Sequence, residues 1–353
     1  RLAVQILQSP SATLLATIAS ESIIDQAYAW LCKQRQSHPP NADIWRFRCH
    51  WKSNRIKLID TLRSGRYQFS PQQRIVLANG KTIHLWNAQD ALIQKAMAMV
   101  LGPQWPISPR CTHIKGNGGI KGALRWLRSK LPHFSFVFRS DVKGYYENID
   151  HTLLINQLER VVIDKDVMRL LVQVIQRTVE WGGTFCEIRR GIGRGSPMSP
   201  LFAALYLKPL DDAMDQAGIA YVRYMDDWVI LATSRHRIRP SVRLVNITLK
   251  RLKLLKHPDK TWVGKIDRGF TFLGYHHTRA GLIPARDTIK RFRQQLTRLY
   301  EQGADSIRIG AYETRWWRWV CAGLPRGWVL VKQPKPDSIF AGTCTVLRRK
   351  YPR

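Results

Sequence analysis

Two adjacent carboxylates interrupt an apolar, β-rich stretch, and no other feature of the chain restricts its fold as strongly. Tyr224-Met225-Asp226-Asp227 lies between residues 221–223 and 228–231, which are rich in β-branched and aromatic side chains. Two acids inside a strand cost free energy unless they lie at a turn or a cation neutralises them. A β-hairpin tip meets both conditions, because it presents carboxylate oxygens to a hard metal ion such as Mg²⁺. A plain turn without a metal is the alternative at this point, since Asp favours turns.

Asp141 supplies a third carboxylate at the end of another β-rich stretch, residues 134–138. If the two stretches are neighbouring strands, Asp141 and Asp226 converge on a pair of metal ions about 3.5–4 Å apart, the arrangement used for in-line phosphoryl displacement. The alternative role for Asp141 is an N-cap of the segment that follows it.

A loop rich in glycine, serine and proline, Gly191–Pro200, is the third element, and an apolar helical pattern follows it at 201–210. Glycines permit close approach of the backbone to a ligand, and the helix beyond Pro200 offers unpaired amide groups. The alternative is an ordinary strand-to-helix connection with proline near the first helical position.

The remaining periodicity predicts helices and one further hairpin. Helical spacing covers residues 12–35, 88–101 and 151–158 and resumes beyond Pro284, while 75–78 and 81–84 are predicted to be strands joined at Asn79-Gly80. Residues 12–35 form the predicted helical N-terminal extension, and the segment from 284 onward forms a basic helical unit.

The charge balance requires an acidic partner. Lys and Arg number 57 against 25 Asp and Glu, a net charge of +32, which predicts binding to a polyanion. Six scattered cysteines without a Cys-x-x-Cys pair favour a reducing compartment. The chain contains no uninterrupted run of about 18 apolar residues, so no membrane span is predicted. The chain begins at Arg1 rather than Met, which leaves its native start open, and no export signal follows, so a cytoplasmic location is expected.

Taken in order, these motifs resemble those of bacterial reverse transcriptases related to group II intron enzymes. Residues 141–146 resemble their first palm motif, 194–200 their template-facing loop and 224–227 their metal-binding hairpin. Lys260 and residues 270–275 resemble the next two motifs, and 80–84, with Gln89, Asp90 and Gln94, resembles the fingers segment. The five motifs between residues 141 and 275 occur in the order of the family, which makes a chance match improbable.

The resemblance implies an α+β right-hand polymerase: fingers, a palm with an antiparallel sheet, and a helical thumb. Its expected divisions are a helical N-terminal extension at 1–50, fingers and the start of the palm at 51–135, the palm at 136–280 and a basic helical thumb and tail at 281–353. The implied activity is RNA-directed DNA synthesis with two Mg²⁺ ions, for which Mn²⁺ is a substitute. The implied partners are an RNA template, the DNA product and dNTPs.

The resemblance also assigns site residues. The implied catalytic residues are Asp141, Asp226, Asp227 and Lys260, and the implied metal ligands are Asp141, Val142, Asp226 and Asp227. Implied nucleotide contacts are Lys81, Tyr146, Arg194, Gly195, Pro197, Tyr224 and Met225, with Tyr146 as the aromatic gate against a ribose 2′-hydroxyl. Implied nucleic-acid contacts are Phe272, Leu273, Gly274, Tyr275, Arg315 and Arg318.

Two features leave alternatives open. Arg194 stands where many relatives have Gln, which places a planar cation near the nucleotide. Trp316 and Trp319 either stack on bases or, as their spacing on one helix face favours, form the packed core of the thumb.

The resemblance is strongest to stand-alone defence-associated reverse transcriptases, which implies a structured noncoding RNA as template and a role against phage. The alternatives are a group II intron or retron-type enzyme, a non-catalytic RNA-binding maturase-like protein, and an RNA-dependent RNA polymerase. The identity of the RNA, the priming mode and the oligomeric state do not follow from the sequence.

Overall fold

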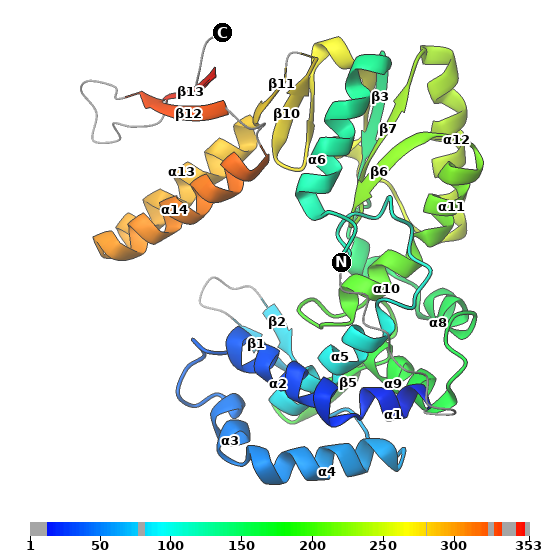
Figure 1. The fold of residues 1–353 in the computed structure, drawn as a ribbon, viewed down its shortest axis with the longest axis vertical. Helices are drawn as coiled ribbons and strands as arrows, with labels where there is room; N and C mark the ends of the chain where they lie inside the picture. Colours follow the sequence, from blue (N-terminus) through cyan, green and yellow to red (C-terminus); the bar gives the residue numbers. More distant parts are fainter. Residues whose placement is uncertain (1–12, 77–81, 280, 324–327, 334–343, 350–353) are drawn as a thin grey trace. The chain divides into compact units, whose positions relative to one another are not determined.

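The chain has a mixed α+β fold that divides into two units, each built from three separate stretches (Figure 1). The computed structural model describes residues 13–76, 82–279, 281–323, 328–333 and 344–349. Unit 1 comprises Arg1–Ser108, Val142–Asp212 and Ile247–Leu255, and unit 2 comprises Pro109–Asp141, Ala213–Asn246 and Lys256–Arg353. The expected division into four consecutive segments therefore does not coincide with these compact units.

Unit 1 begins with four helices whose apolar positions recur at helical spacing: α1 (Leu14–Ile18), α2 (Glu21–Gln34), α3 (Asp43–Cys49) and α4 (Trp51–Arg63). The buried face of α2 presents Ile24, Ala27 and Leu31 and packs against α5 (Ala88–Leu101). The observed bounds of α5 are those predicted from its period, and Asn87 caps it by accepting a bond from the Asp90 amide.

The sheet of unit 1 has the strand order β2-β1-β4-β5. Its strands are β1 (Gln72–Val76), β2 (Thr82–Leu85), β4 (Thr178–Trp181) and β5 (Thr184–Glu187). The predicted strands are confirmed where the structure describes them, at 75–76 and 82–84, while residues 77–81, which include the Asn79-Gly80 turn and Lys81, lie outside the described residues. Unit 1 also contains the helices α7 (Tyr145–Asn148), α8 (His151–Glu159) and α9 (Lys165–Ile175) before β4, and α10 (Ser199–Tyr206) after β5.

Unit 2 is built on an antiparallel sheet with the order β6-β7-β3-β8. Its strands are β3 (Phe136–Ser140), β6 (Ala220–Tyr224), β7 (Asp227–Ala232) and β8 (Trp262–Lys265). Helix α6 (Gly119–Lys130) packs on this sheet, and its Ala123 and Leu127 join Val137, Val229 and Leu231 in one buried cluster. Helices α11 (Lys208–Gln216) and α12 (Arg235–Arg251) are shared between the units.

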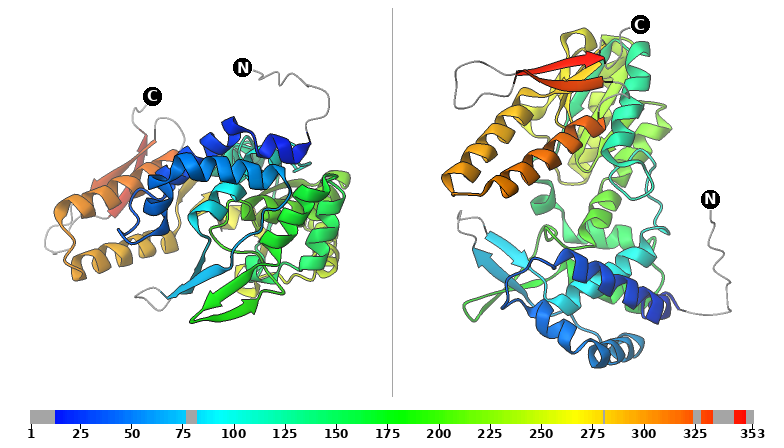
Figure 2. Two further views of the ribbon diagram at one scale, coloured as in Figure 1. Left: turned by 90° about the horizontal axis from the view of Figure 1, so that it is seen from below. Right: turned by 60° about the vertical axis from the view of Figure 1, so that its left-hand side comes forward.

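A second, three-stranded sheet leads into a helical hairpin. Strands β9 (Phe270–Phe272), β10 (Tyr275–Thr278) and β11 (Gly281–Pro284) precede α13 (Arg286–Glu301) and α14 (Ser306–Gly323). The two helices run side by side in the views of Figure 1 and Figure 2. Three short 3₁₀ turns, Leu131–His133, Pro258–Lys260 and Ile266–Arg268, complete the regular structure of this unit.

The C-terminal stretch differs from the helical prediction. The strands β12 (Trp328–Gln333) and β13 (Cys344–Arg349) pair antiparallel, so the segment expected to be a basic helical thumb and tail at 281–353 contains strands as well as helices. Residues 328–331 are the aromatic and aliphatic run Trp328, Val329, Leu330 and Val331, a composition that favours a strand. The expected boundary at residue 281 also falls within the β10–β11 hairpin, and the helical part begins at Arg286.

No helix in the described parts of the chain is long and apolar enough to cross a membrane.

Candidate active site and nucleic-acid surface

The register of three strands brings the predicted catalytic residues of unit 2 to one edge of its sheet. Ser140 of β3 pairs with Trp228 of β7, so the next position places Asp141 across from Asp227. On the other side of β3, Arg139 pairs with Trp262 of β8, and the Ser140 and Thr261 hydroxyls lie 2.7 Å apart. One position further along the two strands, Lys260 lies beside Asp141, and its ammonium contacts the Asp141 carboxylate. Asp141 is therefore the central group, and it is not an N-cap, because the next helix is capped at Gly144.

The hairpin between β6 and β7 confirms the turn predicted around the two carboxylates. Tyr224 pairs with Asp227, which leaves Met225 and Asp226 as a two-residue turn. Met225 has φ 58°, a strained conformation for a non-glycine residue. Two bonds hold it: its amide donates to His113 Nδ1 at 3.1 Å, and the Arg223 guanidinium donates to its carbonyl at 2.8 Å.

The carboxylates at this edge repel one another, and Asp141 is buried while Asp226 and Asp227 are half-buried. Burial and, to a smaller extent, the Asp141 charge raise the pKa of Asp226 to about 6, while the Lys260 and Arg223 charges oppose the increase. Burial likewise raises the pKa of Asp227 to about 7, where the Arg139 charge opposes the effects of Asp141 and Asp226. Each raised pKa means that the ionised acid is unfavourable without additional positive charge.

Asp141 is bound on one oxygen only. Its Oδ2 accepts a hydrogen bond from the Lys260 ammonium at 2.5 Å, while its buried Oδ1 has no hydrogen-bond partner among the described residues. An orphaned carboxylate oxygen beside two acids of raised pKa fits a divalent cation. As the side chains stand, however, no group of three or more His, Cys, Asp or Glu in the described ranges is arranged to hold a metal ion.

The glycine-rich loop lies in unit 1, where a dense set of bonds fixes its backbone. The Ile192 amide donates to the Tyr146 carbonyl at 2.8 Å, and the Ser199 hydroxyl donates to the Gly193 carbonyl at 2.5 Å. Gly191 has φ 80°, and a Cβ there would lie 2.7 Å from the Tyr146 oxygen, so only glycine fits. The loop and the backbone at Tyr146 are thereby tied together.

Arg177, which sequence reasoning missed, supports this loop from within. It is buried, and its guanidinium donates to the Gly191 carbonyl at 2.9 Å and to Gln72 Oε1 at 2.9 Å. His151 Nε2 lies 2.8 Å from the same Gly191 carbonyl, so it donates the second bond. Burial lowers the Arg177 pKa to about 10, and the described residues show no ion pair to it. No local sequence signal marks these contacts, because Gln72 and Arg177 are 105 residues apart.

The other predicted site residues of unit 1 differ in their burial and in the residues that they contact. Tyr146 is half-buried, with its ring stacked on Tyr145. Arg194 is exposed and pairs at 2.6 Å with Glu147, the residue that follows Tyr146 in the chain. Gly195 would have open space around a Cβ. Val142 and Pro197 are buried and half-buried, respectively.

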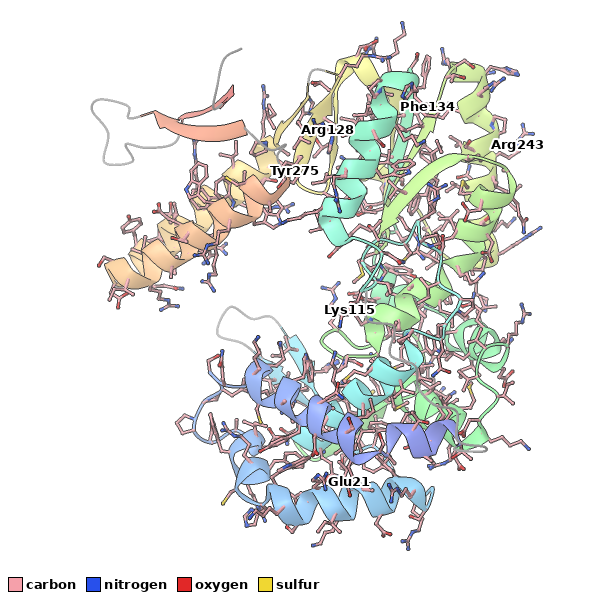
Figure 3. The ribbon with its side chains drawn as sticks, in the orientation of Figure 1. Glu21, Lys115, Arg128, Phe134, Arg243 and Tyr275 are labelled. Carbon is pink, nitrogen blue, oxygen red and sulfur yellow. The ribbon has the colours of Figure 1, made fainter. Side chains whose placement is uncertain are left out.

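The four predicted nucleic-acid contacts at 272–275 differ in how far they are buried. Phe272 and Tyr275 are fully buried, which leaves the Leu273–Gly274 turn as the accessible part. Leu273 has φ 49° and Gly274 φ 83°, the backbone of a tight hairpin turn with positive φ at both positions. The Tyr275 hydroxyl lies 3.1 Å and 3.0 Å from the carbonyl oxygens of Trp319 and Val320, joining this turn to α14 (Figure 3).

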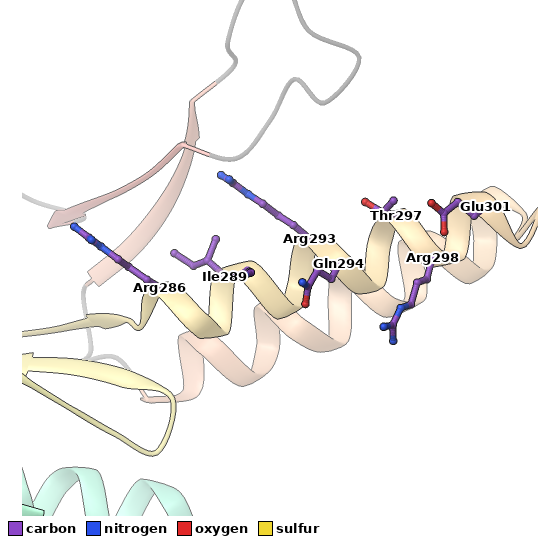
Figure 4. Close-up of a pocket in the computed structure, with 8 residues that line it drawn as sticks. Arg286, Ile289, Arg293, Gln294, Thr297, Arg298 and Glu301 are labelled. Carbon is purple, nitrogen blue, oxygen red and sulfur yellow. The ribbon is translucent and has the colours of Figure 1, made fainter. Parts of the chain in front are cut away.

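Helix α13 borders an open basic pocket with a volume of about 600 Å³ (Figure 4). Its charged members are four basic residues and one acid, and Arg286 and Arg293 extend in the same direction from the helix. The surface is lined by Arg286, Ile289, Lys290, Arg293, Gln294, Thr297, Arg298 and Glu301. Arg315 and Arg318, predicted from the sequence, are exposed on α14. Such a surface suits the phosphates of a nucleic acid.

Comparison with known proteins agrees with this geometry. The family described as "Reverse transcriptase (RNA-dependent DNA polymerase)" matches residues 81–277, more than half of the 353 residues. The chain therefore belongs to the reverse transcriptase family and carries its RNA-dependent DNA polymerase domain. Divalent metal ions are general in this family.

Individual relatives are distant. Protein YkfC of Escherichia coli K12 is 24% identical over 270 residues, which cover 63% of this chain and 70% of YkfC. The group II intron-encoded protein LtrA of Lactococcus lactis subsp. cremoris is 25% identical over 218 residues, covering 59% of this chain and 35% of LtrA. A solved "Partial Cas6-RT-Cas1--Cas2 complex" is similar with a TM-score of 0.42 and 24% identity, over 69% of this chain and 42% of that one. This chain thus spans well under half of LtrA and of that structure.

Proposed function

We propose that the protein copies an RNA template into DNA at the sheet edge that carries Asp141, Asp226 and Asp227. The observation that carries the proposal is the convergence of these acids with Lys260 at the ends of β3, β7 and β8. Asp141, Val142, Asp226 and Asp227 would hold two Mg²⁺ ions, which supply electrostatic stabilisation of the reacting phosphate. Lys260 would donate a proton or contact the leaving pyrophosphate.

The parts of the right hand are proposed accordingly. The sheet β6-β7-β3-β8 is the palm, β1, β2 and α5 belong to the fingers, and α13 with α14 forms the thumb. The helices α1–α3 form the N-terminal extension. Lys81, Tyr146, Arg194, Gly195, Pro197, Tyr224 and Met225 would contact the incoming nucleotide, and Leu273, Gly274, Arg315 and Arg318 the template–primer duplex. The basic face of α13 supports this assignment, since it fits phosphates.

The proposed template is a cognate structured noncoding RNA, and the proposed biological role is defence against phage. The net charge of +32 supports an extended RNA partner; the defence role rests on the resemblance of the sequence motifs. If the protein binds the transcript encoded beside it no better than unrelated RNA at physiological salt, this choice of template is wrong.

Polymerase activity is tested with poly(rA)/oligo(dT), dTTP and Mg²⁺. Wild-type protein should extend the primer, and Asp226→Asn should abolish extension while RNA binding measured by filter retention is unchanged. The enzyme should incorporate dTTP but not UTP on the poly(rA) template. This preference would distinguish it from an RNA-dependent RNA polymerase, which would incorporate UTP. Failure of the wild type to extend several primers, with RNA binding intact, would instead favour a non-catalytic RNA-binding protein.

A further inference from the structure

A second pocket of unit 2, of about 340 Å³, lies where α6, the β9–β10 turn, α13 and α14 meet. Its size lies within the range of about 300–1,000 Å³ usual for small-molecule sites. It is lined by Ile120, Leu273, Gly274, Thr288, Arg291, Phe292, Tyr312, Trp316 and Trp319. None of these residues belongs to the carboxylate edge.

The lining is dominated by flat rings in near-parallel stacks. Phe292 and Trp316 have ring centroids 4.1 Å apart with an interplanar angle of 22°, and Tyr312 continues the stack at 5.7 Å and 16°. Trp319 stacks on Tyr275 at 5.3 Å. Trp316, Trp319 and Tyr312 remain half-buried, so they form part of the packed hairpin and still border the pocket. Planar surfaces of this kind favour a planar aromatic guest.

The charge of the pocket favours an anionic guest. Arg291 is the one charged residue in its lining, and it is exposed. An exposed guanidinium offers a planar fork of donors that matches phosphate. A guest that combines a flat ring with a nearby phosphate therefore suits both halves of the lining, and a nucleotide has this composition.

The turn that borders the pocket is held in a strained form. Leu273 has φ 49°, a sparsely populated conformation for a residue other than glycine. The Gly274 carbonyl accepts bonds from the Ala285 amide at 2.9 Å and the Thr288 hydroxyl at 2.8 Å, which keep the turn against α13. Strain maintained in this way is frequent at ligand clamps.

We infer that this pocket binds one nucleotide, with its base stacked on the rings of α14 and its phosphate at Arg291. The inference rests on the proposed function, in which the Leu273–Gly274 turn contacts a nucleic-acid strand, and it adds a site for one unpaired nucleotide. The guest is either a nucleotide of the bound strand or a free mononucleotide, since both carry the same ring and phosphate.

Photo-crosslinking distinguishes these two sources. A single-stranded DNA oligonucleotide with one 5-iodouracil is irradiated with the full chain, and 5-iodo-dUMP is used in a parallel arm. The excited base loses iodine and couples to the ring on which it is stacked, so peptide mapping by mass spectrometry identifies the contact. Crosslinks at Tyr312, Trp316 or Trp319 are expected, from the oligonucleotide if a strand is the guest and from 5-iodo-dUMP if free nucleotide is.

Three variants test the assignment. Arg291→Ala should lower the yield of this crosslink by about tenfold, the loss expected for one charge-assisted hydrogen bond. The matched control Arg308→Ala removes an exposed charge from α14, outside this pocket and outside the basic surface of α13, and should leave the crosslink at Trp316 and Trp319 in place. Ile120→Trp, which fills the pocket, should abolish it.

Crosslinks from both probes that map only outside Tyr312–Trp319, or an Arg291→Ala yield equal to wild type, would overturn the inference. The pocket crosslink and the primer extension that Asp226→Asn should abolish are separate measurements, so either proposal can fail without the other. Primer extension by the wild type without a pocket crosslink defeats this inference alone. A pocket crosslink in a protein that extends no primer defeats the polymerase proposal alone.

Discussion

His277 should make unit 2 sensitive to acid. Its side chain is buried on β10, where Nε2 donates to the Phe272 carbonyl at 3.2 Å and the ring stacks on Phe270 at 5.4 Å. Burial lowers its pKa from 6.5 to about 4, with a smaller contribution from His276. The folded state therefore holds a neutral imidazole, while the unfolded state binds a proton below pH 6.5.

The sign and size of the effect follow from this difference in proton binding. The stability that His277 contributes is complete above pH 6.5 and is lost as the pH falls toward 4. A shift of this size corresponds to about 3 kcal/mol in total, of which about 2 kcal/mol is lost by pH 5. Since small domains are stable by only about 5–15 kcal/mol, such a loss is readily measured.

The assay is urea unfolding of wild type and His277→Gln at pH 7.5 and 5.0. Gln retains an amide donor for the Phe272 carbonyl but does not titrate. Wild type should lose about 2 kcal/mol more unfolding free energy than His277→Gln between the two pH values. His276→Gln, on the neighbouring position of β10, is the control: it removes only the smaller contribution of His276, so its loss should stay close to that of wild type. Equal losses in wild type and His277→Gln, or an imidazole that titrates near 6.5 by NMR, would refute the reasoning.

Three further substitutions address the proposed site. Lys260→Ala should slow single-turnover nucleotide addition by about 100-fold if the ammonium donates a proton, with unchanged binding of primer–template in a filter assay. Tyr146→Ala should lower the ratio of kcat/KM for dTTP over UTP by at least about tenfold, because less bulk then opposes the 2′-hydroxyl. Arg177→Met leaves Gln72 Oε1 without its donor and should reduce the free energy of unfolding by about 1–3 kcal/mol in urea, while raising KM for dTTP. An Arg177→Met variant with wild-type KM would separate the support of the loop from nucleotide binding.

Local patterns predicted the elements of the site well, because their signals lie within a few residues. The period of 88–101 matches α5, Asp150 caps α8 by accepting a bond from the Leu153 amide, and residues 221–232 form the expected hairpin around Asp226. Each signal is intrinsic to the segment: helical spacing, a capping side chain, or acids that only a turn accommodates.

The groups that tune the site could not be predicted in this way, since they meet across long sequence separations. His113 accepts a bond from the Met225 amide 112 residues away, and the Arg139 guanidinium donates to the Thr271 carbonyl 132 residues away. The sequence between such partners carries no signal of the pairing. The prediction of a basic helical unit also missed the pairing of β12 with β13, because it rested on the helical spacing that follows Pro284 and not on residues 328–349.

The two strained turns of unit 2 show why these distant contacts matter for function. Neither Met225 nor Leu273 is a residue that tight turns favour, and in a short peptide each would move out of the left-handed region. In the folded chain His113 and Arg223 hold the first turn, and bonds from α13 to the Gly274 carbonyl hold the second. Both turns carry residues proposed to touch metal, nucleotide or nucleic acid. The free energy stored in their backbones is therefore supplied by packing elsewhere in the unit, and a fixed position for each turn is what that packing provides.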